Sequence, residues 1–181
     1  MSYTRLLYHI VFRTKYNIPA IDIHWEEDLY RYIWGLVKNK ESILYRIGGM
    51  PDHLHLLVEL SPKWSLADFV RELKTSSGRM LKGNCHFPLF SGWGTGYAAF
   101  TYNLKEKETI TRYIMNQKTH HASVKLADEL RSLLLENGCV IKEDYFMKDD
   151  RPILAHSVRD VGGAPSSAGC APSRALAGGY A

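Results

Sequence analysis

The chain has 181 residues, of which 45% are hydrophobic and 23% charged, a composition typical of a globular domain. It has no apolar run near the roughly 20 residues of a membrane-spanning helix, and its N-terminus lacks the pattern of a signal peptide. The net charge of +4 weakly indicates a polyanionic partner. Its three cysteines are too few and too widely spaced for a disulfide framework or a zinc knuckle, so a cytoplasmic location is expected.

The hydrophobic pattern predicts four strands and four helices. In chain order these are strand 3–16, helix 24–40, strands 42–48 and 53–60, helix 65–82, strand 97–102, and helices 104–121 and 125–136. Ser65 with Asp68 and Asn103 with Glu106 have the spacing of helix-capping pairs.

The order of these elements predicts an α+β fold, the ferredoxin-like split βαβ sandwich. We expect an antiparallel sheet of four to five strands with helices on one face, followed by a C-terminal helix. After about residue 160 the composition changes to Gly, Ala, Ser and Pro, which is typical of disorder. The expected organisation is a domain at 1–160 and a disordered tail at 161–181.

Two histidines stand two positions apart in the predicted strand 53–60. Side chains alternate between the faces of a strand, so Leu54 and Leu56 share one face while His53 and His55 share the other. The Cα atoms of the two histidines would lie about 6.5 Å apart, which lets their nitrogens meet one metal ion. A pair of hydrogen-bonded histidines without metal is the alternative, and the triplet alone leaves both open.

The predicted helix 104–121 carries Tyr113, Gln117 and His121 at four-residue intervals, on one helix face. A tyrosine packed on the sheet and a solvated amide would explain the first two without any chemistry. Combined with the histidine pair, however, the amide oxygen of Gln117 could complete a divalent-ion site with room for a phosphodiester oxygen. Tyr113 could then attack the phosphorus, and the step would be reversible because phenolate is a good leaving group.

These motifs resemble those of a known family. The triplet His53-Leu54-His55 is similar to the histidine–hydrophobe–histidine motif of the HUH endonucleases. The run from Tyr113 to Gln117 resembles the nucleophile helix of the single-tyrosine transposases of the insertion-sequence 200/605 family. The likeness spans about residues 3–148 and includes the stretches 8–16, 96–103 and 116–121.

The resemblance implies a transposase that uses Mg²⁺ or Mn²⁺ to cleave and rejoin single-stranded DNA at the ends of a mobile element. It implies Tyr113 as the nucleophile that forms a 5′-phosphotyrosine, and His53, His55 and Gln117 as the metal ligands. Family members are homodimers that bind DNA hairpins, often with the tyrosine helix of one subunit beside the histidine pair of the other. His121 departs from the family pattern and is either an auxiliary ligand or phosphate contact, or a surface histidine.

Several cations are candidates for contacts with DNA phosphates, which would supply affinity rather than sequence choice. They are Arg13, Lys15, Arg71, Lys74, Arg79 and Lys82. The alternative is a solvated charged surface. Trp93 and Tyr97 flank a glycine-rich loop and could either stack on unpaired bases or pack in the core.

Two other functions stay open from the sequence. A dimer of the same fold could bind hairpin nucleic acid without doing chemistry. A metal-dependent phosphoesterase could use the histidine pair with water as the nucleophile, and it would form no covalent intermediate.

Overall fold

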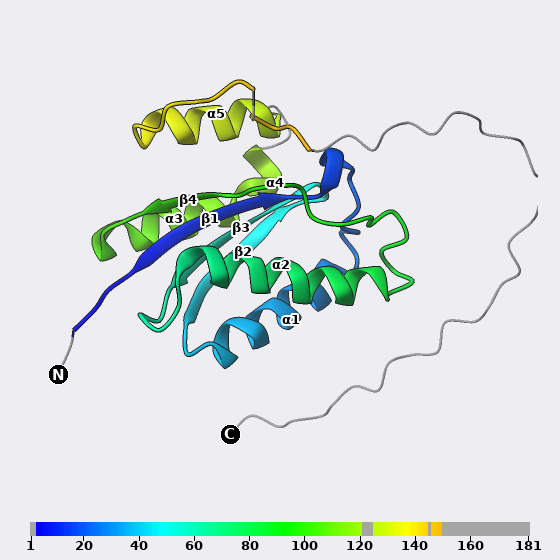
Figure 1. Ribbon diagram of the computed structural model, residues 1–181, viewed down its shortest axis with the longest axis horizontal. Helices are drawn as coiled ribbons and strands as arrows, with labels where there is room; N and C mark the ends of the chain where they lie inside the picture. The colour runs from blue at the N-terminus through cyan, green and yellow to red at the C-terminus, as the bar shows by residue number, and fades with distance from the viewer. Residues whose placement is uncertain (1–2, 121–124, 145, 150–181) are drawn as a thin grey trace, which may run out of the picture. The chain divides into compact units, whose positions relative to one another are not determined.

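The computed structural model describes residues 3–120, 125–144 and 146–149, which lie within one compact unit. The predicted tail at 161–181 and the domain boundary near residue 160 lie outside the described residues, so both stay predictions. Figure 1 shows the order of the elements: β1 (Leu7–Arg13), α1 (Glu26–Asn39), β2 (Ile43–Met50), β3 (His53–Glu59), α2 (Leu66–Lys82), β4 (Ala98–Thr101), α3 (Lys107–Met115), α4 (Gln117–His120) and α5 (Leu126–Glu136). No helix among the described residues has the length and apolar character needed to cross a membrane.

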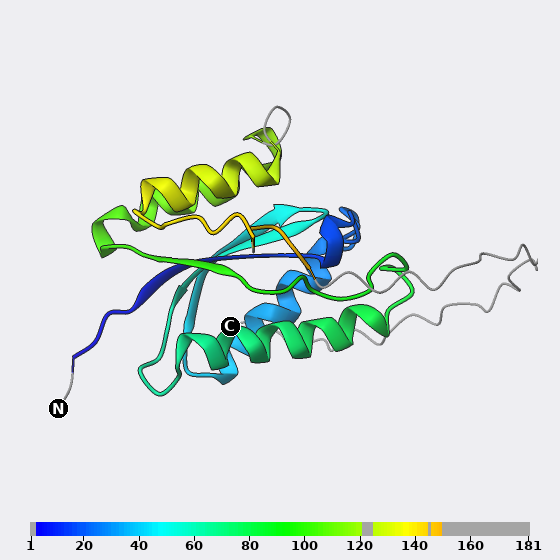
Figure 2. The ribbon, with the colours of Figure 1, turned by 45° about the horizontal axis from the view of Figure 1, so that its top comes forward.

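The strands form one antiparallel sheet in the order β2-β3-β1-β4. Figures 1 and 2 show α1 and α2 on one face of this sheet and α3, α4 and α5 on the other. The four strands with α1 and α2 make up the split βαβ arrangement, which confirms the predicted α+β class. The three later helices therefore cover the sheet face that the ferredoxin-like core leaves open.

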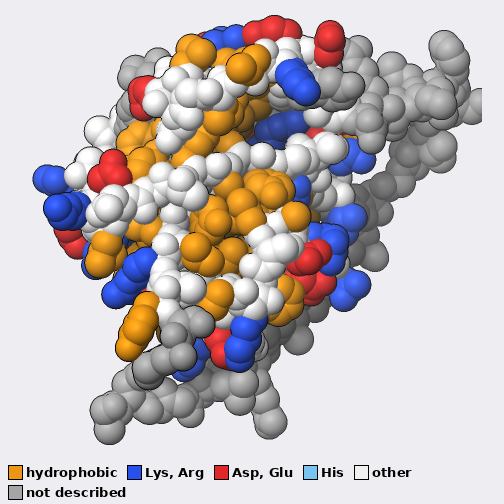
Figure 3. Space-filling model, turned by 60° about the vertical axis from the view of Figure 1, so that its left-hand side comes forward, with side chains coloured by type: hydrophobic (Ala, Val, Ile, Leu, Met, Phe, Trp, Pro, Cys, Tyr) orange, Lys and Arg blue, Asp and Glu red, His pale blue; other side chains and the backbone are white. Residues whose placement is uncertain are grey.

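The alternation predicted for β3 is confirmed. Leu54 and Leu56 are fully buried in the main core with residues of α1 and α2, whereas Leu57 packs with Ile114 of α3 on the opposite face. His53 and His55 lie on this second face, although they are as buried as the leucines. On the side of the molecule shown in Figure 3, hydrophobic side chains gather in the middle and charged side chains lie around them.

Capping residues account for where α2 and the turn before α3 begin. The hydroxyl of Ser65 accepts a hydrogen bond from the backbone N–H of Asp68 at 3.1 Å and caps α2, as predicted. Asn103 and Glu106 form the predicted capping box, but it opens a 3-10 turn that leads into α3. The predicted helix 104–121 is not continuous, because it is interrupted at Asn116 between α3 and α4.

The predicted first strand is also shorter than expected. It ends at Arg13 and is followed by a 3-10 turn in which Tyr16 and Asn17 have φ angles of 59° and 56°. This left-handed backbone cannot continue a strand, and it turns the chain away from the sheet. The end of β1 thereby lies close to the start of β3, where Thr14 N donates to Asp52 O at 2.8 Å.

Candidate active site

Five polar side chains from four elements meet on the sheet face beneath α5. They are His53 and His55 of β3, Tyr113 of α3, Gln117 of α4 and Glu129 of α5. All are buried except Tyr113, which is half-buried. The alternation of β3 turns both imidazoles to this face, and α3 and α5 deliver the phenol and the carboxylate by packing against it.

Three of these side chains have the geometry of a metal site. His53, His55 and Glu129 each offer a ligand atom, and these atoms all lie within 4.8 Å of one another. The Nε2 atom of His53 is 3.7 Å from Oε2 of Glu129, and Nε2 of His55 is 3.7 Å from Oε1. Two imidazoles and a carboxylate are a donor set that fits a divalent metal ion.

The Nδ1 atom of each imidazole, on the side away from Glu129, has a hydrogen-bond partner of its own. Nδ1 of His53 lies 2.7 Å from Oδ1 of Asp52, and Nδ1 of His55 lies 2.9 Å from Nε2 of His9. If each Nδ1–H donates in these bonds, both Nε2 atoms keep a lone pair for a metal. Burial lowers the pKa of His9 to about 4, although the charge of Glu129 opposes the shift. His9 is therefore neutral near pH 7 and can accept the bond from His55.

The phenol of Tyr113 is bound to the same carboxylate. Its hydroxyl donates a hydrogen bond to Oε1 of Glu129, and Nε2 of Gln117 donates to that oxygen at 2.9 Å. Its ring packs edge-on against the imidazoles of His9 and His55, with both centroid separations 5.9 Å. Burial, followed by the hydrogen bond to Glu129, raises the pKa of Tyr113, so the phenol is protonated at neutral pH.

The side-chain oxygen of Gln117 differs from its nitrogen in having no hydrogen-bond partner among the described residues. This oxygen, Oε1, is buried. A buried acceptor without a partner is rare and costs free energy, unless a ligand or ion satisfies it. The oxygen therefore suits the metal-ligand role predicted from the sequence, and that role stays a prediction.

The structure brings together Tyr113, His53, His55 and Gln117, which the sequence singled out, within a single chain. A site shared between subunits stays a prediction from the resemblance. His121 lies outside the described residues. Neither Glu129, the fifth member of the cluster, nor His9, which contacts His55, was predicted from the sequence.

A signal for Glu129 was present in the sequence. It stands three residues after Leu126 and four before Leu133, both of which are buried, so it shares the apolar face of α5. A carboxylate on the buried face of an amphipathic helix calls for a partner, because burying a charge alone is costly. His9 carried a similar signal, since it alternates with Ile10 on a buried strand.

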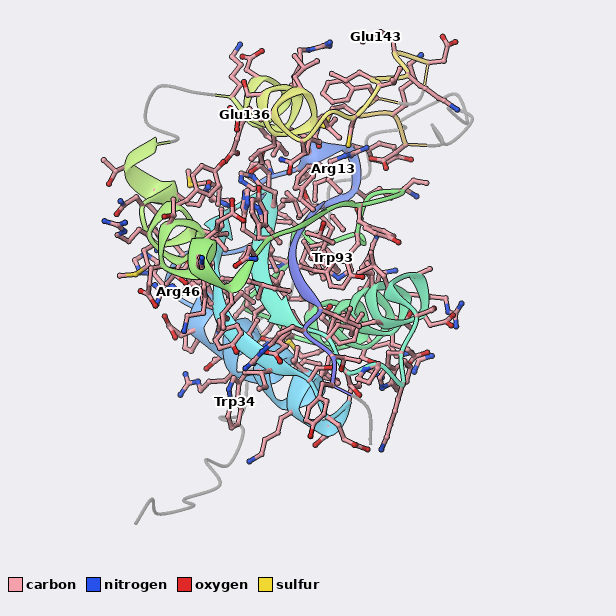
Figure 4. All side chains as sticks on the ribbon, turned by 90° about the vertical axis from the view of Figure 1, so that its left-hand side faces the viewer. Arg13, Trp34, Arg46, Trp93, Glu136 and Glu143 are labelled. Atoms are coloured by element: carbon pink, nitrogen blue, oxygen red, sulfur yellow. The ribbon has the colours of Figure 1, made fainter. Side chains whose placement is uncertain are left out.

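Arg13 does not face solvent. Figure 4 shows it at the end of β1, near the segment that follows α5. Its side chain is 8% exposed, and its Nη1 donates to Oδ2 of Asp149 at 2.6 Å. Asp149 also accepts hydrogen bonds from the backbone N–H groups of Tyr16 and Thr95, each at 2.6 Å. Arg13 is thus part of a buried ion pair rather than of an open basic surface.

Four of the other candidate cations line one groove between α2 and the loop 91–94. They are Lys15, Lys74, Arg79 and Lys82. Lys74 also binds the loop, because its Nζ donates to the carbonyl oxygens of Gly94 and Gly96 at 2.6 and 2.8 Å. Arg71 does not line this groove and pairs instead with Asp68 at 2.7 Å.

The two aromatic residues of the glycine-rich loop differ in their surroundings. Trp93 packs edge-on against Phe12 and Phe90, and its Nε1 donates to Oγ of Ser77 at 3.0 Å. Trp93 therefore lies between the sheet and α2, where it is labelled in Figure 4. Tyr97 is 41% exposed, so it remains accessible to a ligand.

Known proteins with similar sequences and folds are transposases. A family model described as "Transposase IS200 like" matches residues 2–117. The ISDra2 transposase TnpA of Deinococcus radiodurans is 25% identical over 118 residues, which cover 62% of this chain and 84% of that protein. The crystal structure of a candidate transposase from the same organism has 28% identity and a TM-score of 0.51, over 64% of this chain and 93% of its own. A REP-associated tyrosine transposase bound to a REP hairpin has a TM-score of 0.52 over 68% of this chain and 73% of its own, and at 14% identity it shows similarity of fold alone.

Proposed function

Because the chain belongs to the family of IS200-like transposases, we propose that it cleaves and rejoins single-stranded DNA at the ends of a mobile element through a 5′-phosphotyrosine. The observation that carries this proposal is the meeting of one phenol with two imidazoles in a buried cluster. Tyr113 supplies the phenol, and His53 and His55 supply the imidazoles. A purely structural tyrosine would not need two histidines and a buried carboxylate around it.

In the proposed cleavage step the hydroxyl oxygen of Tyr113 attacks the phosphorus of a DNA phosphodiester. A P–O bond to the tyrosine forms while the bond to the 3′ oxygen breaks, and the leaving oxygen takes up a proton as the phenol loses one. The number of phosphoester bonds is unchanged, so a 3′-hydroxyl can reverse the step without ATP. Mg²⁺ or Mn²⁺ held by His53, His55 and Gln117 would withdraw charge from the phosphodiester oxygens.

The groove between α2 and the loop 91–94 is the proposed contact with the DNA backbone. Lys15, Arg79 and Lys82 present positive charge there, which suits phosphates of any sequence. The REP-associated relative is bound to a REP hairpin, and by analogy we propose a hairpin as the structure that this chain binds. We also propose that the protein acts as a homodimer in the cytoplasm.

The decisive experiment is an adduct assay. The protein is incubated with a hairpin-bearing single strand and Mn²⁺, and a covalent protein–DNA species is sought on a denaturing gel. We expect an adduct with the wild type and with the control Tyr97→Phe, and none with Tyr113→Phe. An adduct that persists in Tyr113→Phe would contradict the assignment of the nucleophile.

The same assay separates the two other functions. Strand cleavage without an adduct would indicate a phosphoesterase that uses water. Hairpin binding without cleavage or adduct would indicate a binding module.

A further inference from the structure

The carboxylate of Glu129 occupies the position between the histidine pair and the phenol. Its two oxygens have different neighbours: Oε1 accepts hydrogen bonds from Tyr113 and Gln117, whereas Oε2 lies 3.7 Å from Nε2 of His53. Glu129 belongs to α5, which begins after the segment 2–117 that the family model matches. Its place in the cluster therefore lies outside the segment that the family model matches.

We propose that Glu129 bridges the metal ion and the nucleophile, with Oε2 as a metal ligand and Oε1 as the acceptor that orients the phenol. This inference rests on the proposed function. It assigns the chain a carboxylate ligand in addition to the two imidazoles, and it makes one side chain responsible for the distance between the cation and the hydroxyl of Tyr113.

The distances support a ligand role for Oε2. Two atoms bound to one cation at about 2.1 Å are separated by about 3.0 to 3.4 Å, depending on whether the geometry is octahedral or tetrahedral. The observed 3.7 Å between Oε2 of Glu129 and Nε2 of His53 is longer than these values by about 0.3 to 0.7 Å. A small inward movement of the side chains would bring both atoms to the separation found between two ligands of one metal ion.

The burial of the Glu129 carboxylate also supports its role as a metal ligand. Glu129 is 3% exposed, and burial of a carboxylate is costly unless an opposite charge accompanies it. A divalent cation between Glu129, His53 and His55 would be a favourable partner for this buried charge.

The metal-ligand part is tested by Mn²⁺ affinity, measured from the electron paramagnetic resonance signal of the free ion. Glu129→Gln keeps the shape of the side chain and removes its charge, and we expect the Mn²⁺ dissociation constant to rise at least about 10-fold. Asp128→Asn removes the same charge from the exposed neighbouring position of α5 and should leave the constant within about 2-fold. An unchanged constant in Glu129→Gln would overturn the proposal.

Glu129→Asp is the second variant in case Glu129→Gln does not fold. It keeps the charge but withdraws the carboxylate by about 1.5 Å, so it too should weaken Mn²⁺ binding. Wild-type affinity in a folded Glu129→Asp would count against a ligand at this position.

The positioning part is tested by the rate of adduct formation at saturating Mn²⁺ and saturating DNA. Glu129→Gln retains an oxygen that can accept the phenol's hydrogen bond, whereas Glu129→Ala has none. We expect Glu129→Ala to be at least about 10-fold slower than Glu129→Gln, with DNA affinity unchanged. Equal rates would refute the positioning role. If the wild type forms no adduct, the proposed function fails, while the Mn²⁺ comparison still decides the metal-ligand role.

Discussion

Replacing Gly48 by alanine should move α3, the helix that carries Tyr113. Gly48 lies in β2 opposite His55, and a Cβ atom built on it would be 2.9 Å from the backbone oxygen of Ile114 and 3.1 Å from its Cγ2. Ordinary contacts of carbon begin near 3.5 Å, so α3 would have to retreat by about 0.5 Å. Ile114 directly follows Tyr113, and the phenol would move with it.

Gly48→Ala should change both the free energy of unfolding and the rate of adduct formation. Overpacking of this kind costs about 1 to 3 kcal/mol, so Gly48→Ala should lower the free energy of unfolding by that amount. A displacement of about 1 Å costs about 100-fold in rate, and half of that displacement should slow adduct formation by about 10-fold. The loss of rate should persist at saturating Mn²⁺, since His53 and His55 do not belong to α3.

Gly35→Ala is the matched control. Gly35 lies inside α1, and a Cβ atom there would have no described atom within 4 Å. Alanine should therefore stabilise the helix by up to about 1 kcal/mol and leave the adduct rate unchanged. Unfolding in urea and the adduct assay measure both variants. If Gly48→Ala unfolds and reacts like the wild type, the close approach of α3 to β2 does not hold the phenol in place.

Two further predictions concern charged residues. Arg79→Gln should reduce the slope of log K against log salt concentration for hairpin binding by about 1, because one phosphate contact is lost from the groove. Arg71→Gln, outside the groove, should leave the slope unchanged. Equal slopes in the two variants would mean that the DNA binds elsewhere. Burial tends to raise the pKa of Asp149, but hydrogen bonds from Arg13 and two backbone amides outweigh it and hold the pKa below its usual value. This stabilisation is complete above the unfolded pKa near 4 and is lost as pH falls through the folded value. In urea titrations, Asp149→Asn should therefore lower the unfolding free energy by about 3 kcal/mol at pH 7 and by less at pH 3. A variant whose deficit is the same at both pH values would refute the role of the ion pair.

The elements could be predicted from sequence because their signals are local. The alternation of β3, the cap at Ser65 and the capping box at Asn103 each involve residues within a few positions of one another. The interruption at Asn116 was not predictable from the same signals, because the helical spacing of Tyr113 and Gln117 continues across it. In the structure both side chains still reach one carboxylate, although they belong to two helices.

Only those residues of the candidate site that lie in a short sequence motif could be predicted. The histidine pair and the tyrosine were recognisable because each lies in a short characteristic run. Glu129 and His9 meet the histidine pair because α5 packs on β1 and β4 and because β1 pairs with β3. The sequence marks each as a polar residue on a buried face, but no local pattern specifies which residues it will meet. Arg13 was predicted as a DNA contact on its charge alone. Its burial depends on Asp149, 136 residues later in the chain.

The bond between Arg13 and Asp149 also bears on where the chain can be shortened. The match to the family model ends at residue 117, and a fragment trimmed to that limit would lose the carboxylate that pairs with the guanidinium of Arg13. The smallest piece suited to crystallisation therefore extends to at least residue 149. In a truncation series, the yield of folded material should fall sharply once the end passes Asp149, well before any helix is cut.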